Sequence, residues 1–528
     1  MATMQTFSTQ ESPWAAAQRL FQAGSFSAAR AAAEQVISGE PLHSGARLML
    51  ANLASNEGRH REAVAHVLAA AERMGRQTLQ HVAEVALKLI SVGEYEASVR
   101  LIGKINPSAV PAASSLAEFS QQLSLMDQHE DALRYLQSAL ALDLDGDWVH
   151  YIHGNYLKFM GRLDAAAEAY ERSLRLNPDF AYSHLAIAYL GRPGGEAARA
   201  ARIRESIARV GPFFRDLAYL HYALFKELDG LDDIDAAWQA LQDGFVEKKR
   251  GVSHDAAAET ALVDSIISRT GPGFVGEARP ANGARTPIFV LGMPRTGTTL
   301  LERILGGHSE IALCGELNDF RMQYKWASDH FCLGFFDPEA VRRIDRVDYA
   351  QTGQRYLDHV AWRMPGRSWF TDKNPGNFMM AGLILRALPH ARIIHLRRNP
   401  MDSCFSNLKE LFGSNAHPYS YDFADLATHH RNYTRLMAHW HEIAPGRILD
   451  LDYEDMVSDP ETSARRVMAY CGLTYQPAQI RVETNAAPVS TASSTQVRQP
   501  IHKRNIGGWK RYARQLEPLR LMLEPLAP

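Results

Sequence analysis

Two patterns of hydrophobic and polar residues divide the chain. In the first part, apolar residues recur at helical spacing, and a turn-forming residue followed by an alanine-rich helix returns at Gly24, Gly58, Gly93, Asp127 and Gly161. The intervals are 34, 35, 34 and 34 residues. A period of this length predicts a row of helix pairs, each of which buries its apolar face only against its neighbours.

Two copies show the period most clearly, MDQHEDALRYLQSALALDLD (Met126–Asp145) and MGRLDAAAEAYERSLRLNPD (Met160–Asp179). Ala132 and Ala166 stand where two helices must approach closely, and leucines continue the predicted buried stripe at Leu140, Leu142, Leu174 and Leu176. The pattern resembles the tetratricopeptide repeat over roughly residues 14–190. The resemblance implies a superhelix that binds a protein or peptide, or mediates self-association into homo-oligomers. A bundle of alanine-rich hairpins is the alternative.

Helical character continues beyond Gly191 without a clear period. A stretch dense in Gly, Pro and Ala, Gly271–Pro287, then predicts a linker. We therefore expect additional helices and a linker over residues 191–275, between the repeat array and a third region over 286–528.

Residues 286–528 follow a different pattern, in which short apolar runs alternate with helical stretches. The runs predict strands at Ile288–Gly292, Ser368–Thr371, Arg392–Leu396 and Arg447–Leu451. Short, continuously apolar strands are typical of a parallel sheet that is covered on both faces. The fold class expected here is a P-loop-like α/β domain with a mainly parallel sheet, with its ligand at the carboxyl ends of the strands.

Composition adds little to this picture. The chain has 528 residues with a formal net charge of −2, so its overall charge gives no reason to expect nucleic acid or a membrane surface as a partner. The four cysteines show neither metal spacing nor a disulfide framework, and we see no secretory signal and no apolar run long enough to span a membrane. These features predict a cytoplasmic protein.

The first predicted strand leads into the loop GMPRTGTT. Gly292, Gly297 and Thr299 have the spacing of the nucleotide-hydrolase motif G-x-x-x-x-G-K-[ST], but Thr298 stands in place of its lysine. Backbone N–H groups at the start of the following helix would point at an anion. The loop therefore suits a nucleotide with one compact anionic group at its 5′ end better than a metal-bound triphosphate.

The combination Pro-Arg-Thr-Gly-Thr-Thr resembles the 5′-phosphosulfate loop of sulfotransferases that use 3′-phosphoadenosine 5′-phosphosulfate (PAPS). The resemblance implies that the donor is bound by Arg295, Thr296, Gly297, Thr298 and Thr299. It also implies that the enzyme transfers a sulfuryl group to a hydroxyl.

Three further segments match the family in the same order along the chain. In HLRRNPMDSCFSN, Arg398 and Ser406 match the arginine and serine that bind the 3′-phosphate, a role that suits the forked donors of arginine. In LDLDYEDMVSDP, Tyr453 matches the adenine-contacting tyrosine. The basic-Gly-Trp segment IHKRNIGGWKRY implies phosphate contacts from Lys503 and Arg504.

The catalytic residues follow from a resemblance to tyrosylprotein sulfotransferases. Glu316, in CGE, matches the catalytic base, and we expect it to be partly buried with a raised pKa. Lys373 matches a lysine that stabilises the leaving bridge, and Ser493 matches a serine that holds the sulfuryl oxygens, with Ser494 as the alternative. Read without the family, Glu316 is a helix N-terminal acid and Lys373 a surface lysine in a turn.

Histidines offer weaker candidates. His308 follows the phosphate-loop helix and reads as a residue beyond its C-terminal cap. One predicted helix carries four histidines, and their spacing distributes them around the helix instead of along one face. They are His429, His430, His439 and His441. A metal needs convergent ligands, so we expect no metal site there and no metal cofactor.

The resemblance leaves the acceptor open. The animal enzymes follow their glutamate with a second acid and an arginine that reads acidic peptides, whereas this chain continues Leu317-Asn318-Asp319. A peptide tyrosine, a sugar and a small molecule all remain candidates. Two other functions also remain, namely a Mg-ATP phosphotransferase with a degenerate loop and a non-catalytic repeat scaffold.

Overall fold

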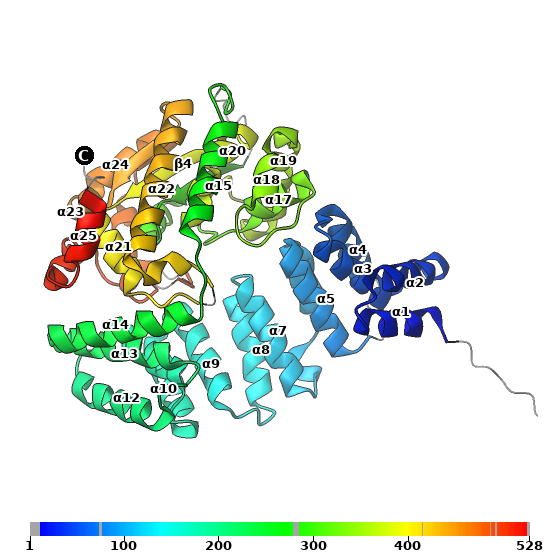
Figure 1. The fold of residues 1–528 in the computed structure, drawn as a ribbon, viewed down its shortest axis with the longest axis horizontal. Coiled ribbons are helices and arrows are strands. Elements are labelled where there is room, and N and C mark those ends of the chain that lie inside the picture. The colour runs from blue at the N-terminus through cyan, green and yellow to red at the C-terminus, as the bar shows by residue number, and fades with distance from the viewer. Residues whose placement is uncertain are drawn as a thin grey trace, which may run out of the picture.

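The computed structural model describes residues 11–72, 77–277, 285–413, 415–485, 487–491 and 494–524. Helices α1 to α14 form an arc that lies along one side of an α/β domain (Figure 1). None of the helices in the described part has the length and apolar composition needed to cross a membrane.

The arc consists of helices that pack as antiparallel neighbours. Their bounds are α1 (Pro13–Gln22), α2 (Phe26–Gly39), α3 (Ser44–Asn56), α4 (His60–Glu72), α5 (Leu79–Val92), α6 (Tyr95–Gly103), α7 (Ala113–Leu125), α8 (His129–Leu140), α9 (Asp147–Phe159), α10 (Leu163–Leu176), α11 (Ala181–Leu190), α12 (Glu196–Val210), α13 (Leu217–Gly230) and α14 (Ile234–Arg250). The pairing therefore continues past residue 190, where the sequence period is lost.

The residues that marked the period all lie in the turns between paired helices. Each has a left-handed backbone, with φ of 73° at Gly24, 74° at Gly58, 88° at Gly93, 59° at Asp127 and 79° at Gly161. Glycine adopts this conformation without strain, and aspartate tolerates it better than most residues do. The period of about 34 residues thus arises because each helix pair needs one residue with a left-handed backbone in its turn.

The predicted stripe holds in part. Ala132 and Ala166 are fully buried and Leu174 is 4% exposed, but Leu142 and Leu176 are 44% and 41% exposed. The expectation that Leu142 and Leu176 are buried was therefore wrong. Leu142 lies beyond the end of α8, and Leu176 is the last residue of α10, so the partner helix no longer covers either side chain.

The α/β domain is built on five parallel strands in the order β2-β3-β1-β4-β5. Their bounds are β1 (Thr286–Leu291), β2 (Ile311–Ala312), β3 (Trp369–Asp372), β4 (Arg392–Arg397) and β5 (Ile448–Asp452). Four agree with the predicted strands to within two residues, and the fold class is confirmed. The two-residue strand β2 is too short to show a hydrophobic pattern.

Helices cover both faces of the sheet. Their bounds are α15 (Ala256–Arg269), α16 (Thr298–Leu305), α17 (Asp319–Ser328), α18 (Pro338–Arg342), α19 (Tyr349–Val360), α20 (Ala381–Ala387), α21 (Pro400–Leu408), α22 (Phe423–Ile443), α23 (Tyr453–Ser458), α24 (Pro460–Cys471) and α25 (Glu517–Leu523). Short 3₁₀ helices are η1 (Pro107–Ala109), η2 (Ile344–Arg346), η3 (Ala361–Arg363), η4 (Pro375–Met380), η5 (Pro418–Tyr421), η6 (Pro477–Ile480), η7 (Val482–Thr484), η8 (Gln496–Arg498) and η9 (Gly508–Tyr512).

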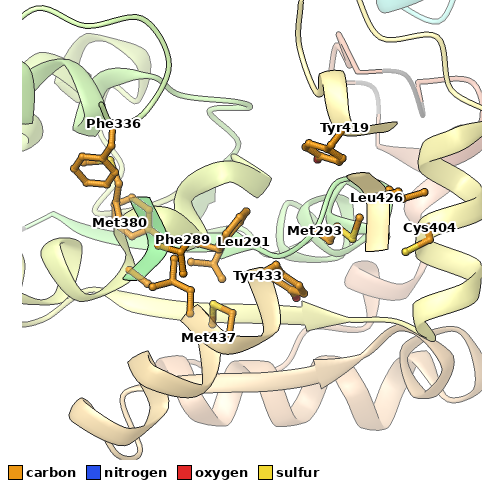
Figure 2. Packing of buried hydrophobic residues seen from close by; sticks show 14 of the residues in the cluster. Phe289, Leu291, Met293, Phe336, Met380, Cys404, Tyr419, Leu426, Tyr433 and Met437 are labelled. Carbon is orange, nitrogen blue, oxygen red and sulfur yellow. The ribbon is translucent and has the colours of Figure 1, made fainter. Parts of the chain in front are cut away.

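Alternate residues of β1 point into two different cores. Phe289 and Leu291 pack with Met380 and with Tyr433 and Met437 of α22 (Figure 2). The intervening residues of β1 instead join a cluster with α16, α23 and α24. Both faces of β1 are therefore held, and this fixes the position of the loop that follows it.

The turns of the helix pairs face the α/β domain in succession. The Gly58 carbonyl accepts the N–H of Phe331 (3.2 Å), and a Cβ at Gly93 would lie 2.6 Å from that of Met322. Further along, the Met126 carbonyl accepts from Arg363 (3.2 Å). One edge of the arc thus lies against the domain over several consecutive repeats.

We predict that Gly93→Ala destabilises the protein more than Gly24→Ala. Both glycines have a positive φ, so each alanine costs about 1 to 2 kcal/mol of backbone strain. Only the methyl group at position 93 would also clash with Met322, since nothing lies within 4 Å at position 24. Urea denaturation midpoints would test this, and equal shifts for the two variants would contradict the close packing of the turn against the domain.

Candidate functional site

The carboxyl ends of β1 and β4 open onto a cavity. We call it the loop cavity, and its lining includes Arg295, Gly297, Thr299, Arg398, Ser406 and Tyr453. Six of the ten residues predicted to bind the donor therefore meet around one space, although they are spread over more than 150 positions of the chain.

The backbone of the loop depends on two close approaches. A Cβ at Gly292 would lie 2.5 Å from the carbonyl oxygen of Leu396 at the end of β4, so only glycine fits there. A Cβ at Gly297 would lie 2.6 Å from the ring of Tyr453. Thr296 donates its hydroxyl to the Met293 carbonyl (2.9 Å) and so braces the loop instead of lining the cavity. Thr298, at the first position of α16, is also buried outside the lining.

Arg398 joins the loop to the C-terminal segment. Its guanidinium donates to the Arg295 carbonyl (2.9 Å) and to the Asn505 carbonyl (2.5 Å), and it lies 4.6 Å from the centre of the Tyr453 ring. Ser406, two turns along α21, is buried and lines the same cavity. A cation and a hydroxyl thus stand together beside the loop, where they could hold a second anionic group.

The C-terminal segment is anchored at the start of α21. The Asp402 carboxylate accepts the N–H groups of Gly507 (2.7 Å) and Trp509 (3.1 Å). Lys503 and Arg504 are exposed and do not line the cavity, and Arg504 donates to Gln499. The segment turns at this point, so the residues on either side of this basic pair face inward instead.

Two lysines in the lining were missed by the sequence analysis. Burial lowers the pKa of Lys409 to about 7, and the charge of Lys226 acts in the same direction. Burial also lowers the pKa of Lys226, which belongs to α13 of the arc. Lys409 lies three residues after Ser406, a helical spacing that could have revealed it. No sequence signal links Lys226 to this cavity.

A second cavity, of about 260 Å³, contains the predicted catalytic pair. We call it the glutamate cavity, and its lining includes Glu302, Arg303, Glu316, Lys373, the turn 127–129 and the strap 487–491. Lys373 is fully buried and its Nζ lies 2.6 Å from Oε1 of Glu316. Burial opposes the charged form of Lys373, but the carboxylates of Glu316 and Glu302 hold its pKa above the usual value.

Glu316 is more exposed than expected, and the alternative reading of Lys373 as a surface lysine is wrong. The Glu316 side chain is 49% exposed, whereas that of Lys373 is at 0%. Lys373 follows β3 directly, and its N–H donates to the Gly315 carbonyl (2.9 Å), so the lysine enters the core of the domain and not a surface turn. The carboxylate at the other end faces the cavity, where an acceptor could reach it.

Glu302 is a further carboxylate that the sequence analysis missed. It accepts from the Thr371 hydroxyl (2.8 Å) and the Gly315 N–H (3.1 Å), and burial raises its pKa. These contacts tie the loop before Glu316 to α16. Glu302 follows the loop motif by one helical turn, and its place on the buried face of α16 was the available signal.

Helix α16 connects the two cavities. Thr299 lines the loop cavity, and Glu302, one turn later, lines the glutamate cavity. The Thr299 hydroxyl lies 3.3 Å from that of Thr491 in the strap. Ser493 lies outside the described residues, and the alternative, Ser494, is buried against a separate hollow beside Tyr189.

The histidine candidates have structural partners. The His308 ring bonds the Thr474 carbonyl (3.0 Å) and is buried. Of the four histidines in α22, His441 meets His395 around Asp450, with both nitrogens within 2.9 Å of one carboxylate oxygen. Arg397 lies 3.3 Å from the other oxygen, so the aspartate is already neutralised by its neighbours.

Comparison with known proteins finds similarity to two families along the chain. Residues 287–477 match the model of the sulfotransferase family, and residues 149–180 match that of the tetratricopeptide repeat. An uncharacterized protein from Aquifex aeolicus (strain VF5) is 31% identical over 319 residues, which is 56% of this chain and 40% of that protein. Protein-tyrosine sulfotransferase 2 from Gallus gallus is 24% identical over 238 residues, which is 42% of this chain. The chain spans 62% of the chicken protein's length.

Among solved structures, the sulfotransferase domain from the curacin biosynthetic pathway is 19% identical, with a TM-score of 0.31, over 46% of this chain and 99% of that one. The similarity to the sulfotransferase family thus covers residues 287–477, and the similarity to the tetratricopeptide repeat covers residues 149–180 of the helical arc.

Proposed function

We propose that this protein transfers a sulfuryl group from PAPS to an acceptor hydroxyl. The observation that carries the proposal is the pairing of two anion-binding groups in one cavity with a glutamate–lysine pair in the next. A donor with a phosphate on the 3′ carbon and a phosphosulfate on the 5′ carbon needs both anchors, whereas a 5′-triphosphate needs one.

The cations of the loop cavity fit such a donor. Lys226 and Lys409 are held in the lining and form no ion pair with a described residue, since the carboxylate of Glu410 in the same lining pairs instead with Arg295 (3.5 Å). A buried cation without a counter-ion is unfavourable, and an anion in the cavity removes that cost. Arg398 and Ser406 would hold the 3′-phosphate, and the N–H groups at the start of α16 the 5′-phosphosulfate.

The residues of the glutamate cavity can complete the transfer. The acceptor oxygen attacks sulfur, the bond from sulfur to the bridging oxygen breaks, and 3′,5′-ADP leaves. Glu316 takes the acceptor proton, a role that the exposure of its carboxylate supports. Lys373, whose Nζ lies 2.6 Å from that carboxylate, supplies positive charge where the leaving oxygen becomes negative.

The acceptor class belongs to this proposal as well. The chicken relative is named for protein tyrosine, which makes a tyrosine-containing peptide the first acceptor to test. Sugars and small phenols are the next acceptors to test. The repeat array would bind a protein or peptide partner.

The first test is calorimetric titration of 3′,5′-ADP against Arg398→Ala. We expect about 10- to 100-fold weaker binding, because a charge-assisted contact is lost, and little change for 5′-AMP. Arg397→Ala is the matched control, since this neighbouring arginine pairs with Asp452 at the surface. Tighter binding of Mg-ATP than of 3′,5′-ADP would instead indicate a phosphotransferase, and absence of nucleotide binding would indicate a scaffold.

The second test is Glu316→Gln. We expect kcat to fall by about 10²- to 10⁴-fold through loss of the base, with binding of 3′,5′-ADP unchanged. Glu310→Gln, at an exposed position six residues away, should transfer at the rate of the unchanged protein. Normal transfer by the Glu316 variant would remove this residue from the mechanism.

A third prediction concerns pH. Free Lys409 loses its proton above about pH 7, whereas bound bisphosphate favours the protonated form. Binding above this pH therefore takes up a proton, and the Kd for 3′,5′-ADP should rise with pH, by at most about tenfold per unit. Lys409→Met should reduce the slope, and Lys510→Met, at an exposed site, should not. A Kd that falls as the pH rises would contradict this assignment.

A further inference from the structure

One wall of the glutamate cavity comes from the helical arc. Of the described residues of the arc, Asp127, Gln128 and His129 alone line this cavity. They form the turn between α7 and the start of α8, at the fourth of the five repeat positions. The turns at Gly58 and Gly93 meet the α/β domain away from it, near Phe331 and Met322.

The turn is held firmly against the catalytic residues. Ser490 of the strap donates to Oδ1 of Asp127 (2.8 Å), and Arg363 donates to the Met126 carbonyl (3.2 Å). A Cβ built on Gly315, which directly precedes Glu316, would lie 3.6 Å from Oδ2 of Asp127. The repeat turn therefore lies within a side-chain length of the loop that carries the proposed base.

The turn keeps hydrogen-bonding capacity for a ligand. Oδ2 of Asp127 takes no hydrogen bond from the described residues, and the Asp127 side chain is 35% exposed. The side-chain amide of Gln128 lies beside it and, among the residues that the structure describes, bonds only the Met126 carbonyl (3.3 Å). A carboxylate and a primary amide together can accept from and donate to the N–H and C=O groups of a polypeptide.

We infer that the turn Asp127–His129 is part of the acceptor site, and that it contacts a polypeptide acceptor beside the hydroxyl that reacts at Glu316. This rests on the proposed function. The repeat array then contributes to acceptor selectivity through a turn inside the active site, in addition to any binding at its distant helices. A small phenol can occupy the space at Glu316 without reaching the turn.

The test compares Asp127→Asn and Gln128→Ala in sulfuryl transfer to a tyrosine-containing peptide and to 4-nitrophenol. Asparagine tolerates the left-handed φ of 59° and keeps the contact with Ser490, and Gln128 makes no capping bond to α8, so both variants should fold. We expect the peptide KM to rise by about threefold to tenfold through loss of a contact made in the bound state, with kcat, the KM for 4-nitrophenol and the Kd for 3′,5′-ADP unchanged.

Arg61→Ala is the control. Arg61 donates to the carbonyls of Trp326 (2.8 Å) and Ala327 (2.6 Å), so its loss weakens the contact between arc and domain without touching the cavity. A rise in peptide KM equal to that of Arg61→Ala would overturn the inference, as would no change at all. Equal effects on peptide and 4-nitrophenol would overturn the polypeptide as occupant.

A second measurement uses Gln128→Cys. All four native cysteines are buried, and burial raises the pKa of Cys314, which lines the same cavity, to about 12, so a maleimide should react at position 128 alone. The bulky adduct should block transfer to the peptide and leave binding of 3′,5′-ADP intact. Full transfer by the labelled protein would overturn the inference, as would failure of the unlabelled protein to use the peptide. Loss of 3′,5′-ADP binding in the unlabelled protein would instead refute the proposed function, while the labelling rate still reports whether the turn faces an open cavity.

Discussion

The close approach between the turns of the helical arc and the α/β domain is the constraint on which both cavities depend. Each cavity has walls from both parts of the chain, Lys226 in one and the turn at Asp127 in the other. The approach is close because the turn residues have either no side chain or a short one and adopt a left-handed backbone. A larger residue at Gly93 or Gly161 would collide with Met322 or Arg498 of the domain.

Within the α/β domain, the same kind of constraint places the proposed donor site. Gly292 lets β1 end against the carbonyl of Leu396 in β4, and this brings the loop and Arg398 together. The charges then follow from burial. Lys373 is in direct contact with the Glu316 carboxylate, whereas Lys226 and Lys409 form no ion pair with a described residue, and burial lowers the pKa of both. An anion bound in the loop cavity, as proposed, would stabilise these two lysines.

The sequence predicted those features that repeat locally or match a motif. The period from Gly24 to Gly161 and the four apolar strands are patterns of neighbouring residues, and the structure agrees with them. Arg398, Ser406 and Tyr453 lie around the same cavity as the loop because their motifs follow strand ends. The exposed positions of Lys503 and Arg504 could not be foreseen, since composition does not show which side of a turn faces inward.

Contacts between segments that are distant in the sequence could not be predicted from the pattern of hydrophobic and polar residues. Lys226 enters one cavity from α13 and stands in no motif, whereas Asp127 was recognised as a repeat position but nothing in the repeat pattern linked it to the other cavity. The exposure of Glu316 beside a buried Lys373 was not visible in the sequence either, because the depth of each side chain depends on how β3 meets the loop at Gly315.

The strap that follows residue 486 is fastened on two sides. Thr491 meets Thr299 of α16, while Ser490 bonds Asp127 and the N–H of Val489 bonds the Phe159 carbonyl. If a nucleotide binds at the loop and a partner binds at the array, as proposed, a segment tied to both links the two binding free energies. Such coupling is reciprocal, so each ligand would change the affinity for the other by the same factor. Binding at the repeats would then change the measured affinity at the loop cavity, and binding at the loop cavity would change the measured affinity at the repeats.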